Sequence, residues 1–262
     1  MKVIKFMNIV LIFVLACTIT VYAEYDTYAR NLAVLTEYQI IETPYYTEIG
    51  FISRLKYVTA LMKAIGAMDQ PVIGMSDFIQ KWVEVDGYTI TENGELIWYG
   101  DPSSKEDGTY CLSELLPYIG IATYTGIVKG EVYDGNNYFC ADRDITLAEA
   151  MLLMMRCLGS LDLNDSELAL QQAEERGLIT QEDIFYSISN ARLTPEMFCT
   201  IMVRFLDQPR TRYFPNYYGG FMGVKDTNGR ITYLKYLMKR KECIGDPDAG
   251  DEIPLPQMWD RN

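Results

Sequence analysis

The chain has 262 residues, 49% of them hydrophobic, and its 36 acidic against 23 basic side chains give a formal net charge of −13. The hydrophobic fraction predicts a buried core rather than disorder, and the acidic balance argues against nucleic acid as a partner, because phosphate contacts need clustered lysine and arginine. The sequence contains no histidine, which excludes Ser-His-Asp and Cys-His catalysis and His-ligated metal sites, so we expect neither a metal nor a cofactor.

The first 23 residues have the pattern of a secretory signal peptide. Lys2 and Lys5 give a basic start, an apolar run follows over 9–21, and Ala23 ends a small-residue cleavage signature. We therefore expect a secreted protein at the cell wall or cell surface, with no membrane span after cleavage. An uncleaved anchor and lipidation at Cys17, in the stretch VLAC, stay open as alternatives.

Residues 24–68 contain the first of three similar segments. An apolar helix is expected over 28–41, and a second helix begins after Ser53 as its N-cap and ends at Gly66. The second helix has an apolar stripe at helical spacing. Its members are Leu55, Val58, Leu61, Met62 and Ile65.

An insertion over 69–112 separates the first segment from the second. The stretch YTITENGELIWY (88–99) predicts a β-hairpin, because Asn93-Gly94 suits a type I′ turn between β-prone arms. Residues 100–108 are expected to form a loop. The hairpin, with Trp98, would either form a binding surface or pack over an edge of the core.

The second segment covers 113–160 and the third 161–207. In the second, a helix over 115–130 precedes Thr146, which forms a capping box with Glu149. In the third, a helix over 168–179 precedes Thr194, an N-cap followed by proline at the first helical position. A two-helix unit cannot bury its own apolar faces, so the three should pack together. The predicted fold is mainly α, with three helix-loop-helix repeats in a pseudo-threefold bundle, a small β-hairpin insertion and an irregular C-terminal extension.

The second segment also carries a recognisable motif. It reads GIVKG at 126–130, has Phe139 in the following loop and reads ITLAEA at 145–150. This pattern resembles the S-layer homology domain, whose repeat has a helix ending in Gly-Ile-Val-x-Gly, a loop with an aromatic residue, an Ile-Thr-Arg-Ala-Glu motif and a second helix. The matching positions elsewhere are Ile52, Ser53 and Arg54 in the first segment, and Gly177, Leu178, Ile179, Leu193 and Thr194 in the third.

The resemblance implies a module that holds a protein non-covalently on a secondary cell-wall polysaccharide in the envelope of Gram-positive bacteria. Such polysaccharides are often anionic through pyruvyl groups, and the motif arginine of the family helps to bind them. Here that arginine is retained only as Arg54, because Leu147 and Pro195 occupy the corresponding positions. We therefore expect glycan binding centred on the first repeat. The candidate glycan-binding residues lie in the motif or in the loops beside it and are Ser53, Arg54, Lys56, Arg143, Thr146, Glu149, Arg192 and Thr194.

Each of these cations also has a structural interpretation. Arg54 would be an ordinary surface residue of its helix, and Arg143, Arg192 and Lys129 would be solvated loop cations.

Residues 208–262 form the C-terminal extension and tail. The stretch 229–245 is expected to be a helix, or a strand followed by a helix, and 246–262 an acidic tail. The basic end of this stretch (Lys235, Lys239, Arg240 and Lys241) would either meet an anionic wall polymer or complement the helix dipole. Of the cysteines that follow the signal segment, Cys157 and Cys199 are expected as buried thiols. A bridge between Cys111 and Cys140 stays open.

The sequence thus favours an envelope attachment protein without enzymatic activity. Two alternatives remain: a degenerate repeat module that binds another envelope protein, and a secreted glycan hydrolase that uses a pair of carboxylates.

Overall fold

The computed structural model describes residues 27–42, 50–67, 88–90, 96–98, 112–133, 136–183, 186, 190–215, 221–225 and 230–244. The fold is mainly α-helical, as predicted. The predicted signal peptide with Cys17, the turn at Asn93-Gly94, the loop 100–108 and the tail 246–262 lie outside the described residues.

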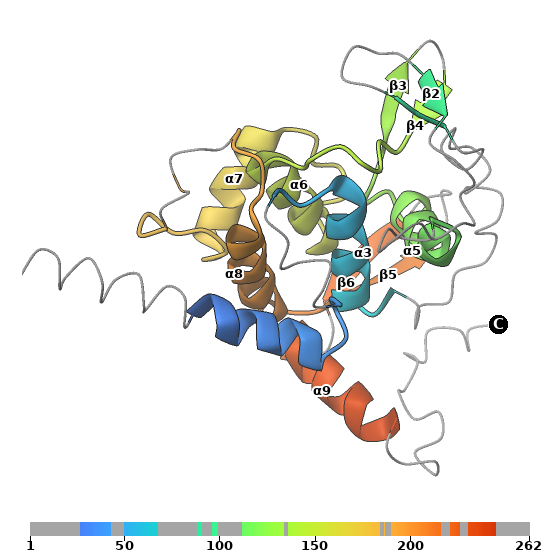
Figure 1. Cartoon of the computed structure of the whole chain (residues 1–262). Helices are drawn as coiled ribbons and strands as arrows, with labels where there is room; N and C mark the ends of the chain where they lie inside the picture. The colour runs from blue at the N-terminus through green and yellow to red at the C-terminus, as the bar shows by residue number, and fades with distance from the viewer. Residues whose placement is uncertain are drawn as a thin grey trace, which may run out of the picture.

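The first predicted repeat contains a helix over 27–37 and α3 (Arg54–Ala64). The side chain of Ser53 caps α3 by accepting a hydrogen bond of 3.3 Å from the amide of Lys56. All five predicted stripe residues are buried. In Figure 1, α3 stands near the centre of the molecule.

The second predicted repeat contains α5 (Leu112–Tyr124) and α6 (Leu147–Cys157). The capping box forms as expected, because Thr146 Oγ1 accepts from the amide of Glu149 and the Glu149 carboxylate accepts from the amide of Thr146. Most residues of α6 are buried, so this helix is surrounded by protein on nearly all sides.

The third predicted repeat contains α7 (Ser166–Glu175) and α8 (Pro195–Leu206). Asp165 caps α7, a signal that the sequence analysis did not use. Thr194 caps α8 by accepting from the amide of Met197, and Pro195 takes the first helical position, where no amide donor is required.

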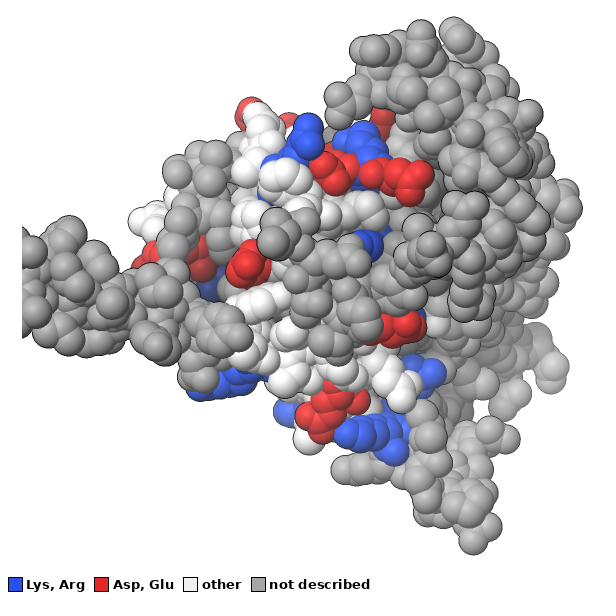
Figure 2. All heavy atoms as spheres, viewed as in Figure 1, with Lys and Arg blue, Asp and Glu red and all other residues white. Residues whose placement is uncertain are grey.

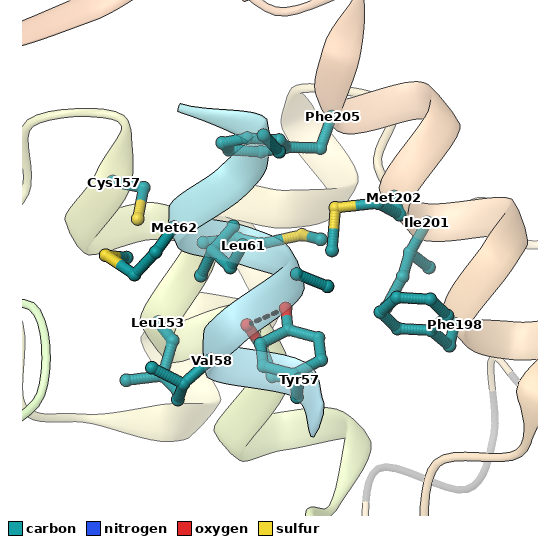
Figure 3. Close-up of a cluster of buried hydrophobic side chains, with 14 of the residues drawn as sticks. Tyr57, Val58, Leu61, Met62, Leu153, Cys157, Phe198, Ile201, Met202 and Phe205 are labelled. Carbon is teal, nitrogen blue, oxygen red and sulfur yellow. Dashed lines mark hydrogen bonds between the residues drawn. The ribbon is translucent and has the colours of Figure 1, made fainter. Parts of the chain in front are cut away.

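The second helices of the three segments share one apolar core. Figure 3 shows α3 in the middle, with side chains of α6 on one side and of α8 on the other. The Tyr57 ring meets Phe198 edge-to-face at 6.0 Å between centroids. Tyr57 also donates a buried hydrogen bond to the carbonyl oxygen of Ala150 on α6. A single core therefore joins elements of all three segments.

Three backbone hydrogen bonds close a ring where these helices begin. The amide of Ile52 donates to the carbonyl of Leu193 at 2.8 Å, the amide of Leu193 to the carbonyl of Ile145 at 2.8 Å, and the amide of Ile145 to the carbonyl of Ile52 at 3.0 Å. Each of these buried residues directly precedes a helix N-cap.

The first helices of the three segments end in the same way. Gln39, Gly126 and Gly177 all have a left-handed backbone, with φ of 57°, 79° and 69°. Each of their amides donates to the carbonyl three residues earlier, and each is followed by two buried apolar residues. Those residues are Ile40 and Ile41, Ile127 and Val128, and Leu178 and Ile179.

The described strands form three two-stranded antiparallel sheets. Strands β1 (Tyr88–Ile90) and β2 (Leu96–Trp98) pair as the predicted hairpin of the insertion. Two further pairs were not predicted. They are β3 (Glu131–Tyr133) with β4 (Asn136–Tyr138), and β5 (Thr211–Pro215) with β6 (Phe221–Lys225).

The prediction of an irregular C-terminal extension is wrong for residues 211–215 and 221–225, which form strands, whereas the helix expected within 229–245 is present at 233–244. Beyond the β5–β6 pair, α9 (Tyr233–Ile244) packs on the core. The Tyr233 ring stacks on Phe205 at 4.7 Å, and its hydroxyl donates to the carbonyl of Cys157 at 2.8 Å. At the bottom of Figure 1, α9 lies beside the helix over 27–37, and Lys241 pairs with Glu37 at 2.9 Å.

Cys157 and Cys199 are buried free thiols, as expected. Cys140 is also buried, and Cys111, its partner in the bridge that the sequence left open, lies outside the described residues.

Candidate functional site

The ring of hydrogen bonds brings the three N-cap residues to the same end of the core. Isolated antiparallel bridges join Ser53 to Asp144 and Thr146 to Arg192. The amide of Arg54 donates to the carbonyl of Arg143 at 2.7 Å. Candidate residues that are far apart in the sequence therefore meet at the junctions between the segments.

Arg54 is a buried cation. Its residue exposure is only 7%, and its guanidinium carbon lies 5.6 Å from the centre of the Phe139 ring. Burial, followed by the nearby charge of Arg143, lowers the pKa of Arg54 from its ordinary value, while Glu149 and Glu131 act in the opposite direction. The interpretation of Arg54 as a surface residue is therefore wrong.

The guanidinium of Arg54 is poorly satisfied. The Arg54 Nη1 atom lies 3.8 Å from Glu149 Oε1, an ion pair too long for a hydrogen bond. Its Nε is sealed from solvent without an acceptor. Within the described part of the chain, the side chain of Arg54 donates no hydrogen bond. A buried charged donor without an acceptor lowers the stability of the fold unless another group accepts its hydrogen bond.

Arg143, by contrast, holds two carboxylates. It donates to both oxygens of Glu149, at 3.2 and 2.6 Å, and to Glu131 Oε1 at 2.7 Å. With Arg54, these residues form what we call the Arg54 cluster: Arg54, Glu131, Arg143 and Glu149. The cluster contains two cations and two anions, and Arg143 is not the solvated loop cation of the alternative interpretation.

Glu149 remains ionised in this setting. Burial alone would raise its pKa, but hydrogen bonds from Arg143 and the Thr146 amide, with the charges of Arg143 and Arg54, hold the pKa below its ordinary value. A glycosidase acid needs a raised pKa. Glu149 therefore does not have the raised pKa that a general acid requires.

The remaining loop cations are also paired. Arg192 donates to Asp144 Oδ2 at 3.0 Å, and its guanidinium lies 5.5 Å from the centre of the Phe51 ring. Lys129 donates to Asn164 Oδ1 at 2.8 Å, an oxygen that also accepts from Arg156. Both side chains are nevertheless exposed, as the interpretation as solvated loop cations expects.

The equivalent positions in the other segments carry different chemistry. Leu147 and Pro195 stand one residue after their caps, where the first segment has Arg54. Lys56 and Met197 stand three residues after their caps, where the second segment has Glu149. Leu147 and Met197 are buried. Among these positions, Arg54 and Glu149 are therefore the one oppositely charged pair that the structure brings together.

The candidate residues fall into two groups. Arg54, Arg143 and Glu149 meet directly, with Thr146 bonded to Glu149, while Ser53, Thr194 and Lys56 lie at the first turns of α3 and α8. Glu131 and Asp144 were not predicted from the sequence. Glu131 is the first residue of β3 and Asp144 lies in the loop before α6. No periodicity marks a role for either, although their opposite charge to nearby arginines is a weak signal.

Figure 2 shows basic and acidic side chains intermixed along the upper edge of the described surface, so no large basic patch stands out there. None of the described helices is both long enough and apolar enough to cross a membrane. No family model and no curated protein matches the chain.

Proposed function

We propose that the protein is a secreted, S-layer-homology-like attachment protein of a bacterial envelope. Its three divergent repeats pack around a pseudo-threefold axis, and it binds a cell-wall polysaccharide without catalysing a reaction. An anionic sugar occupies the junction of the first two repeats, where Arg54 is its main ligand.

The closed ring of hydrogen bonds supports the repeat architecture. Ile52, Ile145 and Leu193 each donate to one partner and accept from the other, as three copies of one unit around a common axis would do. The left-handed helix ends at Gln39, Gly126 and Gly177 add a second equivalence. All of these positions except Gln39 belong to the motif. Its residues thus occupy corresponding places in the three segments, which supports the resemblance to the S-layer homology domain.

The unsatisfied guanidinium of Arg54 is the observation that carries the binding function. A permanently charged, planar donor suits a carboxylate or pyruvyl group, which can accept two parallel hydrogen bonds. Glu149 is already held by Arg143, so an anionic sugar would supply acceptors that Arg54 lacks. The sugar would meet the Nη atoms, of which Nη1 has only the 3.8 Å contact with Glu149, because Nε is sealed from solvent.

We expect one sugar-binding site in the molecule, at Arg54. Leu147 and Pro195 cannot donate to an anionic sugar, so the junctions they line offer no substitute for Arg54. The attachment should therefore be monovalent and lack the gain in affinity that several linked sites provide.

Cell-wall pull-down tests the proposal. The protein is mixed with purified Gram-positive sacculi before and after extraction of their polysaccharide. Retention is expected only on intact sacculi and should fall with rising salt, because the contact is ionic. Retention that survives extraction, or none on intact sacculi, would contradict polysaccharide attachment.

Two variants assign the binding to Arg54. Arg54→Gln removes the charge and should abolish retention, while circular dichroism checks that the fold is kept. Arg230→Gln makes the same substitution at an exposed position before α9 and should be retained like the wild type. Equal retention of all three proteins would show that Arg54 is not the ligand.

A further inference from the structure

Three side chains form a second cluster beside the Arg54 cluster. Phe51, Asp144 and Arg192 each stand two residues before a helix N-cap, and we call them the Phe51 cluster. Arg192 joins the other two, because it donates to Asp144 Oδ2 at 3.0 Å and lies 5.5 Å from the centre of the Phe51 ring.

The backbone directs this cluster toward solvent. The residues that follow its members are Ile52, Ile145 and Leu193, and all three are buried in the core. Successive side chains of extended backbone point to opposite sides. Consistent with this, 47% of Phe51 and 53% of the Arg192 side chain are exposed.

The Phe51 cluster is continuous with the Arg54 cluster. Asp144 directly follows Arg143, and Ser53, which pairs with Asp144 in an antiparallel bridge, directly precedes Arg54. The amide of Arg54 also donates to the carbonyl of Arg143. The two clusters therefore adjoin each other where the three predicted repeats meet.

We propose that the Phe51 cluster is a second saccharide subsite, which receives the sugar residue next to the one held by Arg54. This inference rests on the proposed function, and it assigns an extended oligosaccharide as the ligand. A pyranose ring has a face of C–H groups that packs on an aromatic ring. Its hydroxyl groups meet the donors of Arg192 and the acceptor oxygens of Asp144.

The chemistry of the cluster favours a neutral sugar at this position. Arg192 is already paired with Asp144, so the cluster has no net charge to attract an anion. The exposed ring supplies apolar contact that a charged group would not use. The two subsites thus bind different sugar residues: Arg54 binds the anionic residue, and Phe51 binds the neutral residue next to it.

The test compares two probes and three variants. One probe is polysaccharide released from Gram-positive sacculi, and the other is a single pyruvylated monosaccharide. Phe51→Ala should weaken polysaccharide binding roughly three- to tenfold and leave monosaccharide binding unchanged. Phe51→Tyr keeps the ring and should bind both probes like the wild type. Leu168→Ala removes another exposed apolar side chain, on α7, and should also bind both probes like the wild type.

The outcomes separate this inference from the proposed function. If the wild type binds neither probe, the proposed function fails. If the wild type binds both probes and Phe51→Ala has no effect, or weakens both equally, the second subsite is overturned while Arg54 binding stands. An effect of Phe51→Ala on capture of another envelope protein, with polysaccharide binding unchanged, would also overturn it. Thermal unfolding of each variant establishes that the fold is intact.

Discussion

The hydroxyl of Tyr57 on α3 donates a 2.8 Å hydrogen bond to the carbonyl oxygen of Ala150 on α6, 93 residues away in the chain. Both residues are fully buried. The bond fixes how α3 and α6 pack, because the Tyr57 ring also contacts Phe198 on α8. One side chain thus links three helices, each from a different segment.

Tyr57→Phe should therefore destabilise the protein modestly. The ring and its packing remain, and the lost hydrogen bond is worth about 1 kcal/mol. Tyr57→Ala removes the ring as well and should cost roughly 3 to 5 kcal/mol. Urea denaturation measures both. If Tyr57→Phe cost as much as Tyr57→Ala, the hydroxyl rather than the ring would dominate this contact.

The docking of α9 depends on a glycine. Gly66 has φ of +66°, and a Cβ added there would lie 2.5 Å from Cε1 of Tyr236. The Tyr236 ring cannot easily move aside, because Arg210 stacks over it at 3.4 Å. Gly66→Ala should cost about 1 to 2 kcal/mol for the backbone and about 1 to 3 kcal/mol more for the clash.

Gly126→Ala is the matched control. This glycine has φ of +79°, and an added Cβ there meets nothing within 4 Å, so only the backbone penalty applies. In a Tyr236→Ala background the cost of Gly66→Ala should fall to that of the control. A cost that stayed high in this background would mean that the Tyr236 ring is not the obstacle.

The ion pair between Asp183 and Arg204 makes the stability of the fold depend on pH. Asp183 accepts from Arg204 at 2.6 and 2.8 Å and from the Thr180 amide at 2.7 Å. Burial alone would raise the pKa of Asp183, but these hydrogen bonds and the Arg204 charge hold it below its ordinary value. The carboxylate therefore stabilises the fold above its unfolded pKa of about 4. This contribution is lost as the pH falls through the lower folded pKa.

Asp183→Asn should lower stability at pH 7 and flatten its dependence on pH below about pH 4. Asp162→Asn changes an exposed carboxylate and should leave the profile nearly unchanged. The free energy of unfolding is measured from pH 2 to 7 for each protein. If the free energy of unfolding of Asp183→Asn fell with pH as steeply as that of the wild type, other carboxylates would be responsible for the acid sensitivity.

The local features of the fold could be predicted from sequence. Ser53, Thr146 and Thr194 cap their helices as expected, because capping depends on a few consecutive residues. The apolar stripes were predictable for the same reason. The first helices were predicted too long. The helix expected over 28–41, for example, ends at 37. It ends there because Gln39 adopts a left-handed backbone conformation, which a glutamine in the sequence does not predict.

The contacts of the candidate site could not be predicted, because they join distant loops. Arg143 forms an ion pair with Glu131, the first residue of β3, and no period in the sequence marks that approach. Arg54 was identified as a candidate, yet its burial depends on Phe139 and the second segment. The β5–β6 pair was missed since its tyrosines and glycines are equally typical of loops.

The capping box of α6 gives the last prediction. Thr146 and Glu149 satisfy each other's backbone amides, whereas Thr194 accepts one hydrogen bond from Met197 without such a return contact. Thr194→Ala should cost about 1 kcal/mol, and Thr146→Ala up to about 2 kcal/mol, because Glu149 also loses its hydrogen bond with the Thr146 hydroxyl. Thr146→Ser keeps the hydroxyl and should restore most of the stability. Chemical denaturation ranks the three variants, and equal costs for the two alanine variants would mean that the hydrogen bond from the Thr146 hydroxyl to Glu149 adds nothing.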